Sequence, residues 1–233
     1  MLPKIQKVVK GRSIILFIFL VVAADQVLKI YVKTHYHSGE WHPVTGNWFR
    51  LYFIENEGMA YGWKFGGESG KLLLTLFRLA AVIFGVFYLK RIIRKKYHRG
   101  FIICAALIFA GALGNLIDSL FYGLIFDESS PILLNVARIF PAQGYAGFLH
   151  GKVVDMLYFP VIRNAHFPSW IPVWGGEEFE FFRPIFNLSD ASISIGVIAI
   201  LLFQKRFFNQ TKKEISYPGV EKEVIVNDEI QVS

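Results

Sequence analysis

Cysteine is almost missing from this chain, which has a single one, Cys104, among 233 residues. One cysteine excludes an intrachain disulfide, and its place inside an apolar run indicates a small helix-packing residue rather than a reactive thiol. Charged residues are also few, at 18% of the chain against 54% hydrophobic residues. The hydrophobic residues occur in continuous blocks, which is not the pattern of a water-soluble domain.

Familiar catalytic and metal-binding signatures are absent as well. The chain has no HExxH zinc motif and no GxSxG nucleophile motif. Its six histidines are His35, His37, His42, His98, His150 and His166. They form no pair at metal-ligand spacing on a helix, so we expect neither a metal nor an organic cofactor. The net charge of +7 does not indicate nucleic acid binding, because Lys and Arg cluster beside the apolar blocks.

Long apolar runs are what the chain has instead. A helix that crosses a bilayer needs about 20 mostly apolar residues. Four such spans are predicted, over about Ser13–Val32, Leu72–Ile92, Phe101–Phe121 and Ile185–Phe207. The first lacks a clear small-residue cleavage site, so we expect it to be retained rather than removed as a signal peptide. The fold class predicted is an integral membrane, mainly α protein with four transmembrane helices.

Basic residues predict the orientation of these helices. One cluster precedes the first span, a second fills the turn between the second and third, and a third follows the fourth. The positive-inside rule then places both termini in the cytoplasm and the long segments 34–70 and 122–184 outside. We predict one four-helix domain over residues 1–208 and a flexible cytoplasmic tail over 209–233.

The outer segments have features of their own. Residues 47–63 combine a strand-like run with a glycine-containing turn, which predicts a small extracytoplasmic β element. Residues 160–184 are rich in Trp, Phe and Pro, a composition that suits a surface in the lipid headgroup zone.

Two aspartates are predicted to lie at a similar depth below the outer surface. Asp118 follows Phe101 by seventeen residues, or about 25 Å of helix, and Asp190 lies about one turn into the fourth span from outside. Each follows an asparagine, Asn115 or Asn187, by three residues, which places amide and acid on roughly one helix face.

The paired pattern favours chemistry over a structural role. Asp190 taken alone fits a helix N-terminus, where a carboxylate is stabilised, but Asp118 lies toward a helix C-terminus, where it is not. Ionisable residues inside a membrane are often functional. Two close carboxylates would share one proton, leaving a base that activates a water and an acid that protonates a leaving nitrogen.

Five short motifs follow one another along the chain. They are Asp25–Lys29 (DQVLK), Asn56–Gly62 (NEGMAYG), Gly114–Asp118 (GNLID), Gly151–Phe159 (GKVVDMLYF) and Phe186–Gly196 (FNLSDASISIG). In this order and on a four-span frame, residues 20–205 resemble lipoprotein signal peptidase, the type II signal peptidase of bacteria. The resemblance implies a membrane aspartyl endopeptidase that removes the signal peptide from diacylglyceryl-modified prolipoproteins, cutting before the lipidated cysteine. It also implies a location in the bacterial cytoplasmic (inner) membrane. The depth of the two aspartates puts the active site at the outer leaflet, and we expect a monomer, although the sequence leaves the oligomeric state open.

The resemblance assigns roles to particular residues. It implies that Asp118 and Asp190 are the catalytic pair. The supporting residues that it implies are Asn115 and Asn187, which orient the pair, Asn56, which holds the substrate backbone, and Gly58 and Ala60, which leave room for it.

Two further acids are interpreted without a catalytic role. Asp25 and Lys29 have the i, i+4 spacing of an ion pair within the first span, which either clamps the packing or shapes the site. Asp155 is expected to be structural or orienting.

The chain departs from the family pattern at three places. Ser119 stands where many relatives have Arg, and Ser189 stands where Ala is usual. The outer segment between Gly123 and Pro184 is unusually long, and we expect it to rest on the bilayer or to cover the cleft.

Two other classes of function stay open on the sequence. A small transporter or a scaffold could line a polar path with Asp118, Asp190 and Lys29. Transport sites usually lie near the midplane, whereas these acids lie near one surface, which favours the peptidase.

Overall fold

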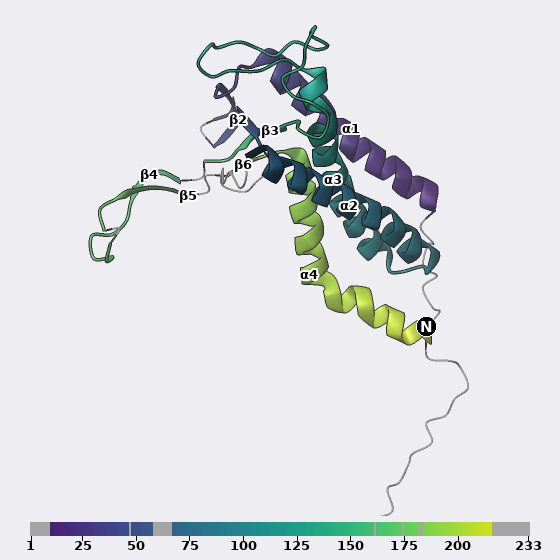
Figure 1. The fold of residues 1–233 in the computed structure, drawn as a ribbon. Helices are drawn as coiled ribbons and strands as arrows, with labels where there is room; N and C mark the ends of the chain where they lie inside the picture. The colour runs from purple at the N-terminus through teal and green to yellow at the C-terminus, as the bar shows by residue number, and fades with distance from the viewer. Residues whose placement is uncertain are drawn as a thin grey trace, which may run out of the picture.

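Four long helices form the body of the protein (Figure 1). The computed structural model describes residues 10–46, 48–57, 67–160, 162–173, 175–181 and 184–215. The helices are α1 (Gly11–His35), α2 (Gly67–Arg94), α3 (Arg99–Ile125) and α4 (Leu188–Ile215). Each contains a stretch long and apolar enough to cross a membrane, so the prediction of four spanning helices is confirmed.

Helix α3 is the centre of the bundle. It packs against α1, α2 and α4. Of the residues in its most apolar stretch, 56% are buried inside the protein, compared with 17% in each of the other three helices. The other helices expose large apolar side chains, among them Phe19 on α1, Phe84 on α2 and Leu202 on α4. Such faces are stable in lipid rather than in water, which makes the chain a multi-pass membrane protein.

Two glycines let α4 approach α3 closely. A Cβ on Gly111 would collide with the backbone carbonyl of Ser189, and a Cβ on Gly114 would collide with the Ser189 hydroxyl and the Asp25 carboxylate. Small residues at a helix crossing allow this kind of backbone approach in a membrane. The first turn of α4 therefore lies directly against the polar side chains of α1 and α3.

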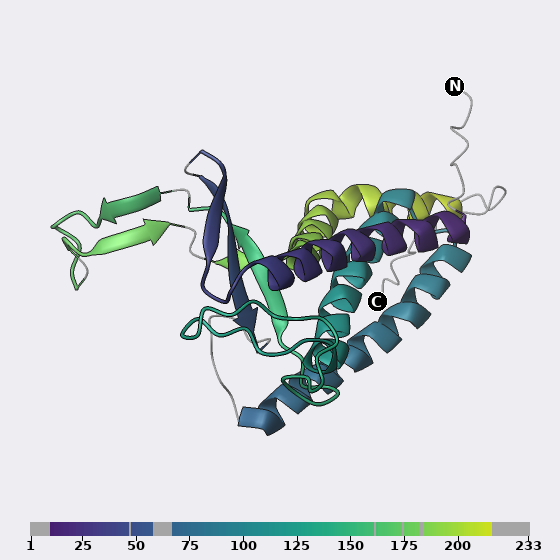
Figure 2. The same cartoon turned by 90° about the horizontal axis from the view of Figure 1, so that it is seen from above.

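An antiparallel sheet lies at the end of the bundle where α1 and α3 finish and α2 and α4 begin (Figure 2). Its order is β1-β2-β3-β6, from β1 (Trp41–Thr45), β2 (Phe49–Asn56), β3 (Val153–Tyr158) and β6 (Ile185–Phe186). β2 confirms the β element predicted within residues 47–63, and β1, which precedes that range, pairs with it. Residues 58–63, which contain the predicted turn, lie outside the described residues. The register of β2 and β3 pairs Asn56 with Val153 and Ile54 with Asp155.

The long outer segment has more regular structure than the sequence indicated. It supplies β3 to the sheet and leads directly into β6, and β4 (Ile162–His166) and β5 (Glu178–Phe181) form a separate hairpin that projects away from the helices (Figure 2). Trp170 and Val173, between β4 and β5, are exposed. Contact of this hairpin with the bilayer or the cleft stays a hypothesis.

The predicted start of the fourth span needs correction. Ile185 and Phe186 pair with β3 as a strand rather than starting the helix. Helix α4 begins at Leu188 and continues to Ile215, and its stretch apolar enough to cross a membrane ends at Phe208, one residue from the predicted end of the span. The predicted domain bounds stay a prediction. Residues 216–233 of the expected tail lie outside the described residues.

Candidate active site

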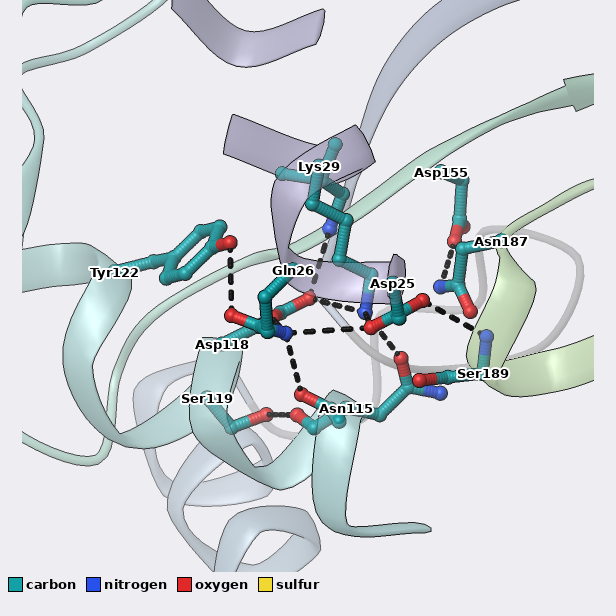
Figure 3. A network of polar contacts seen from close by, with 12 residues as sticks. Asp25, Gln26, Lys29, Asn115, Asp118, Ser119, Tyr122, Asp155, Asn187 and Ser189 are labelled. Carbon is teal, nitrogen blue, oxygen red and sulfur yellow. Dashed lines mark hydrogen bonds and ion pairs between the residues drawn. The ribbon is translucent and has the colours of Figure 1, made fainter. Parts of the chain in front are cut away.

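A buried ion cluster joins α1 to α3 (Figure 3). Lys29 Nζ lies 2.9 Å from Asp25 Oδ2 and 2.7 Å from Asp118 Oδ2, and all three side chains are at most 1% exposed. The i, i+4 ion pair predicted between Asp25 and Lys29 is therefore confirmed. Asp118 Oδ1 accepts a further hydrogen bond from Gln26 Nε2 at 2.9 Å. Both oxygens of Asp118 thus already have strong donors within the protein.

The same cluster fastens the start of α4. Asp25 Oδ1 accepts the backbone N–H of Ser189 at 2.8 Å, and Ser189 lies in the first helical turn, where N–H groups have no partner within the helix. Gln26 also donates to the carbonyl of Gly114 at 3.2 Å and accepts from the Tyr122 hydroxyl at 3.1 Å. These contacts give Asp25 and Gln26 structural roles that hold α1, α3 and α4 together.

Asn115 connects this cluster to Asp190. Its Oδ1 accepts from Lys29 Nζ at 2.8 Å, and its Nδ2 donates to Asp190 Oδ1 at 2.7 Å. A lysine ammonium can only donate, so its contact determines which end of the amide faces Asp190. The orienting role predicted for Asn115 agrees with this geometry, and Lys29 in turn orients Asn115.

Asn187 connects Asp190 to Asp155. It immediately precedes α4, and its Oδ1 accepts the N–H of Asp190 at 2.9 Å, the contact of a helix N-cap. Asn187 therefore caps the helix instead of sharing a helix face with Asp190. Its Nδ2 donates to Asp155 Oδ1 at 2.7 Å, and Asn56 Nδ2 donates to Asp155 Oδ2 at 3.0 Å.

The environment of Asp155 changes its acidity. Asp155 is on β3 with 4% of its surface exposed. Burial and, after it, the negative charge of Asp190 raise the pKa of Asp155 to about 7, although the hydrogen bonds from Asn56 and Asn187 lower it in part. Two carboxyl groups whose charges act on each other thus occur here, and one of them holds its proton near neutral pH.

The structure separates the predicted site residues into two groups. Asn56, Asn115, Asp155, Asn187 and Asp190 form one connected polar network, whereas Asp25, Lys29 and Asp118 form the ion cluster beside it. Gly58 and Ala60 lie outside the described residues. Among the described residues, no three His, Cys, Asp or Glu side chains are grouped as a metal site.

Two residues of this region were not singled out from the sequence. One is Gln26, inside the first motif. The other is Arg78 on α2, whose guanidinium donates to Ser119 Oγ at 2.8 Å. A signal was present for both, because each is a polar or charged residue within a span that is otherwise apolar.

Comparisons with known proteins agree with this architecture. A family model described as signal peptidase (SPase) II matches residues 17–206. A lipoprotein signal peptidase of Porphyromonas gingivalis is 46% identical over 199 residues, covering 84% of each chain. One of Amoebophilus asiaticus is 32% identical over 194 residues, covering 82% of this chain and 77% of its own.

Solved structures share the fold. One bacterial membrane enzyme structure determined by the in meso method has a TM-score of 0.54 and 25% identity, covering 86% of this chain and 97% of its own. Another has a TM-score of 0.53 and 24% identity, covering 94% of this chain and 99% of its own. With a family match across most of its length and a relative at 46% identity, the chain belongs to the signal peptidase II family, an aspartic peptidase family.

Proposed function

We propose that this protein is a membrane aspartic endopeptidase that removes the signal peptide from diacylglyceryl-modified prolipoproteins, with Asp155 and Asp190 as its catalytic pair. The choice of this pair rests on the surroundings of the Asp155 carboxyl group. It is a buried carboxyl held by two amide donors, its pKa is about 7, and Asp190 is one cause of that value. This is what an aspartic pair that shares one proton requires.

The pair differs from the one predicted from the sequence, Asp118 and Asp190. Asp118 is fully buried and ion-paired to Lys29, and its second oxygen is bound by Gln26. A carboxylate held in this way would have to break an ion pair before it could take a proton from water. The catalytic role of Asp118 stays a prediction, and the geometry favours Asp155 in its place.

Asp190 acts as the base and Asp155 as the acid in this proposal. Asp190 lies in the first turn of α4, where the helix dipole favours a carboxylate, and Asn115 donates a hydrogen bond to it. Asp190 takes a proton from the attacking water, and the hydroxide bonds to the carbonyl carbon while Asp155 protonates the carbonyl oxygen. Asp190 then gives its proton to the leaving nitrogen, the C–N bond breaks, and Asp155 recovers its proton from the intermediate hydroxyl.

The arrangement of the chain supports a site at the outer surface of the bacterial inner membrane. Asp155 is on the sheet and Asp190 is in the adjoining turn of α4, whereas the basic clusters lie at the opposite ends of the helices. The positive-inside rule then places the termini in the cytoplasm and the acids outside. Lipid chains of the substrate would enter from the bilayer while the amide reaches the acids.

A transporter or scaffold is less well supported than a peptidase. The polar path considered for it needs Lys29 and Asp118 to face a passage, and both are fully buried and paired with each other. Family membership also favours the peptidase.

Cleavage of a lipidated prolipoprotein by the purified protein tests the proposal. We expect the wild type to cut the lipidated precursor and not the unlipidated one. Asp155→Asn and Asp190→Asn should each reduce turnover by at least about 1000-fold while the protein remains folded. Failure of the wild type to cut would contradict the proposed function itself.

Asp118→Asn is the matched control that separates the two candidate pairs. The amide keeps the shape of the side chain, and Lys29 keeps its partner Asp25. We expect turnover within about tenfold of the wild type. Loss of activity in a folded Asp118→Asn variant, with Asp155→Asn still active, would restore the pair predicted from the sequence.

A further inference from the structure

Arg78 is a charged residue in the middle of an apolar helix. It is the one charged residue in the stretch 72–89 of α2, which is otherwise suited to lipid. A guanidinium at such a position is unfavourable unless protein groups receive it. One hydrogen bond of its guanidinium goes to Ser119 Oγ on α3, at 2.8 Å, so Arg78 points toward the core of the bundle rather than the bilayer.

Ser119 brings this guanidinium next to the candidate active site. Ser119 is fully buried, directly follows Asp118, and donates its own hydroxyl hydrogen to the carbonyl of Asn115 at 3.0 Å. Asn115 is the residue whose amide binds Asp190. Two residues of α3 thus connect Arg78 to the proposed base.

The charges around Arg78 come from every element that meets at the site. Its guanidinium interacts electrostatically with Asp190 on α4, Asp118 on α3 and Asp155 on β3. On its own helix, Lys71 is a second cation that Arg78 repels. Lys29 on α1 is the cation of the ion cluster, and it also acts on Asp155.

A count of these charges indicates what Arg78 does. Lys29 is ion-paired with two carboxylates, Asp25 and Asp118, so its one positive charge is already set against two negative charges before the proposed pair is counted. An ionised Asp190, which is half-buried, adds a further negative charge that has a hydrogen bond from Asn115 but no cation of the Lys29 cluster paired with it. Arg78 supplies the missing positive charge from α2.

We propose that Arg78 is a positioning residue of the peptidase site, held by Ser119, whose positive charge sets the pH range in which Asp155 and Asp190 together carry one proton. The proposal rests on the proposed function and adds a residue outside the five motifs. It also accounts for Ser119, because its hydroxyl accepts a hydrogen bond from the Arg78 guanidinium and an arginine at that position would have no acceptor to offer.

The alternative for Arg78 is a purely structural one, in which its hydrogen bond pins α2 to α3. The pH dependence of kcat/KM distinguishes the two. Removing a cation favours protonated carboxyl groups, so the acidic and alkaline limbs of the profile should both move to higher pH. Loss of a helix contact would lower stability and leave both limbs in place.

The experiment compares pH profiles for cleavage of the lipidated precursor. We expect Arg78→Met to shift both limbs upward by about one pH unit and Arg78→Lys, which keeps the charge, to retain a profile near that of the wild type. Arg138→Met is the matched control, because Arg138 is exposed and pairs with Asp127 outside the site, and it should leave the profile unchanged.

A charge-swap variant keeps the test decisive if Arg78→Met does not fold. Arg78→Ser combined with Ser119→Arg returns the guanidinium from α3, and we expect it to restore the wild-type profile. A folded Arg78→Met with unmoved limbs, or a folded swap variant with a displaced profile, would overturn the proposal for Arg78 alone. The proposed function fails separately, through an inactive wild type or an active Asp190→Asn.

Discussion

Asn187 Nδ2 lies 2.7 Å from Asp155 Oδ1, and this contact joins the start of α4 to strand β3. The carbonyl oxygen of the same amide caps α4 through the N–H of Asp190. An amide has its acceptor and its donor on one planar group, so the helix cap determines where the donor points. Capping the helix and positioning the acid are therefore one function of one side chain.

Asn187→Ala should reduce activity far more than its effect on stability explains. Loss of the cap costs about 1 kcal/mol, whereas a misplaced Asp155 carboxyl should lower kcat about 100-fold. His98→Ala is the control, because the His98 side chain caps α3 by accepting the N–H of Gly100 at 3.1 Å. Thermal denaturation and kcat of both variants check the prediction, and equal losses of activity would contradict it.

The rate of cleavage should fall as the pH rises through about 7. The raised pKa of Asp155, about 7, means that its carboxyl is protonated below this pH and becomes an unreactive carboxylate above it. A profile of kcat/KM between about pH 5 and 9 should therefore have an alkaline limb near 7. Folding must be followed over the same range, and a folded enzyme with a flat profile up to pH 9 would rule out Asp155 as the acid.

Lys29→Met should strongly destabilise the protein. The substitution leaves Asp25 and Asp118 as buried carboxylates without their cation, a change that costs about 3–5 kcal/mol. Combining it with Asp118→Leu removes one of the stranded charges and should recover part of that loss. Lys205→Met, at an exposed position of α4, is the control, and denaturation midpoints in detergent provide the measurement. If the double variant lost as much stability as the two single variants together, Lys29 and Asp118 would not be coupled, which would contradict the prediction.

Gly111→Ala should displace α4 from α3. The new Cβ would meet the backbone carbonyl of Ser189, which cannot move without shifting the turn that contains Asp190. Overpacking of this kind costs about 1–3 kcal/mol, and activity should fall with it. Gly147→Ala adds the same methyl group where no atom lies within 4 Å, so it should leave stability and activity unchanged. A fully active, stable Gly111→Ala would show that this close approach is not required.

Much of the architecture follows from local rules that a sequence displays. A bilayer demands about 20 apolar residues per helix, so α1 to α4 were predicted from runs of residues without reference to their neighbours. The ion pair of Asp25 with Lys29 depends only on one helical turn, and it too was predicted correctly. The depth of Asp190, near the start of its helix, follows from the same counting.

Contacts between distant segments were decided only by the tertiary structure. Helical spacing gives Lys29 one partner, Asp25, whereas its bond to Asp118 exists because α1 packs on α3. Asp155 reaches Asn187 only because β3 and β6 pair at the end of the bundle, an arrangement that no periodicity in the outer segment revealed. The sequence by itself determined the four spans and the acids available near one surface. Which acid lies in an ion pair and which lies beside the Asn187 amide depended on packing across the chain, because both have the same side chain and differ only in their neighbours.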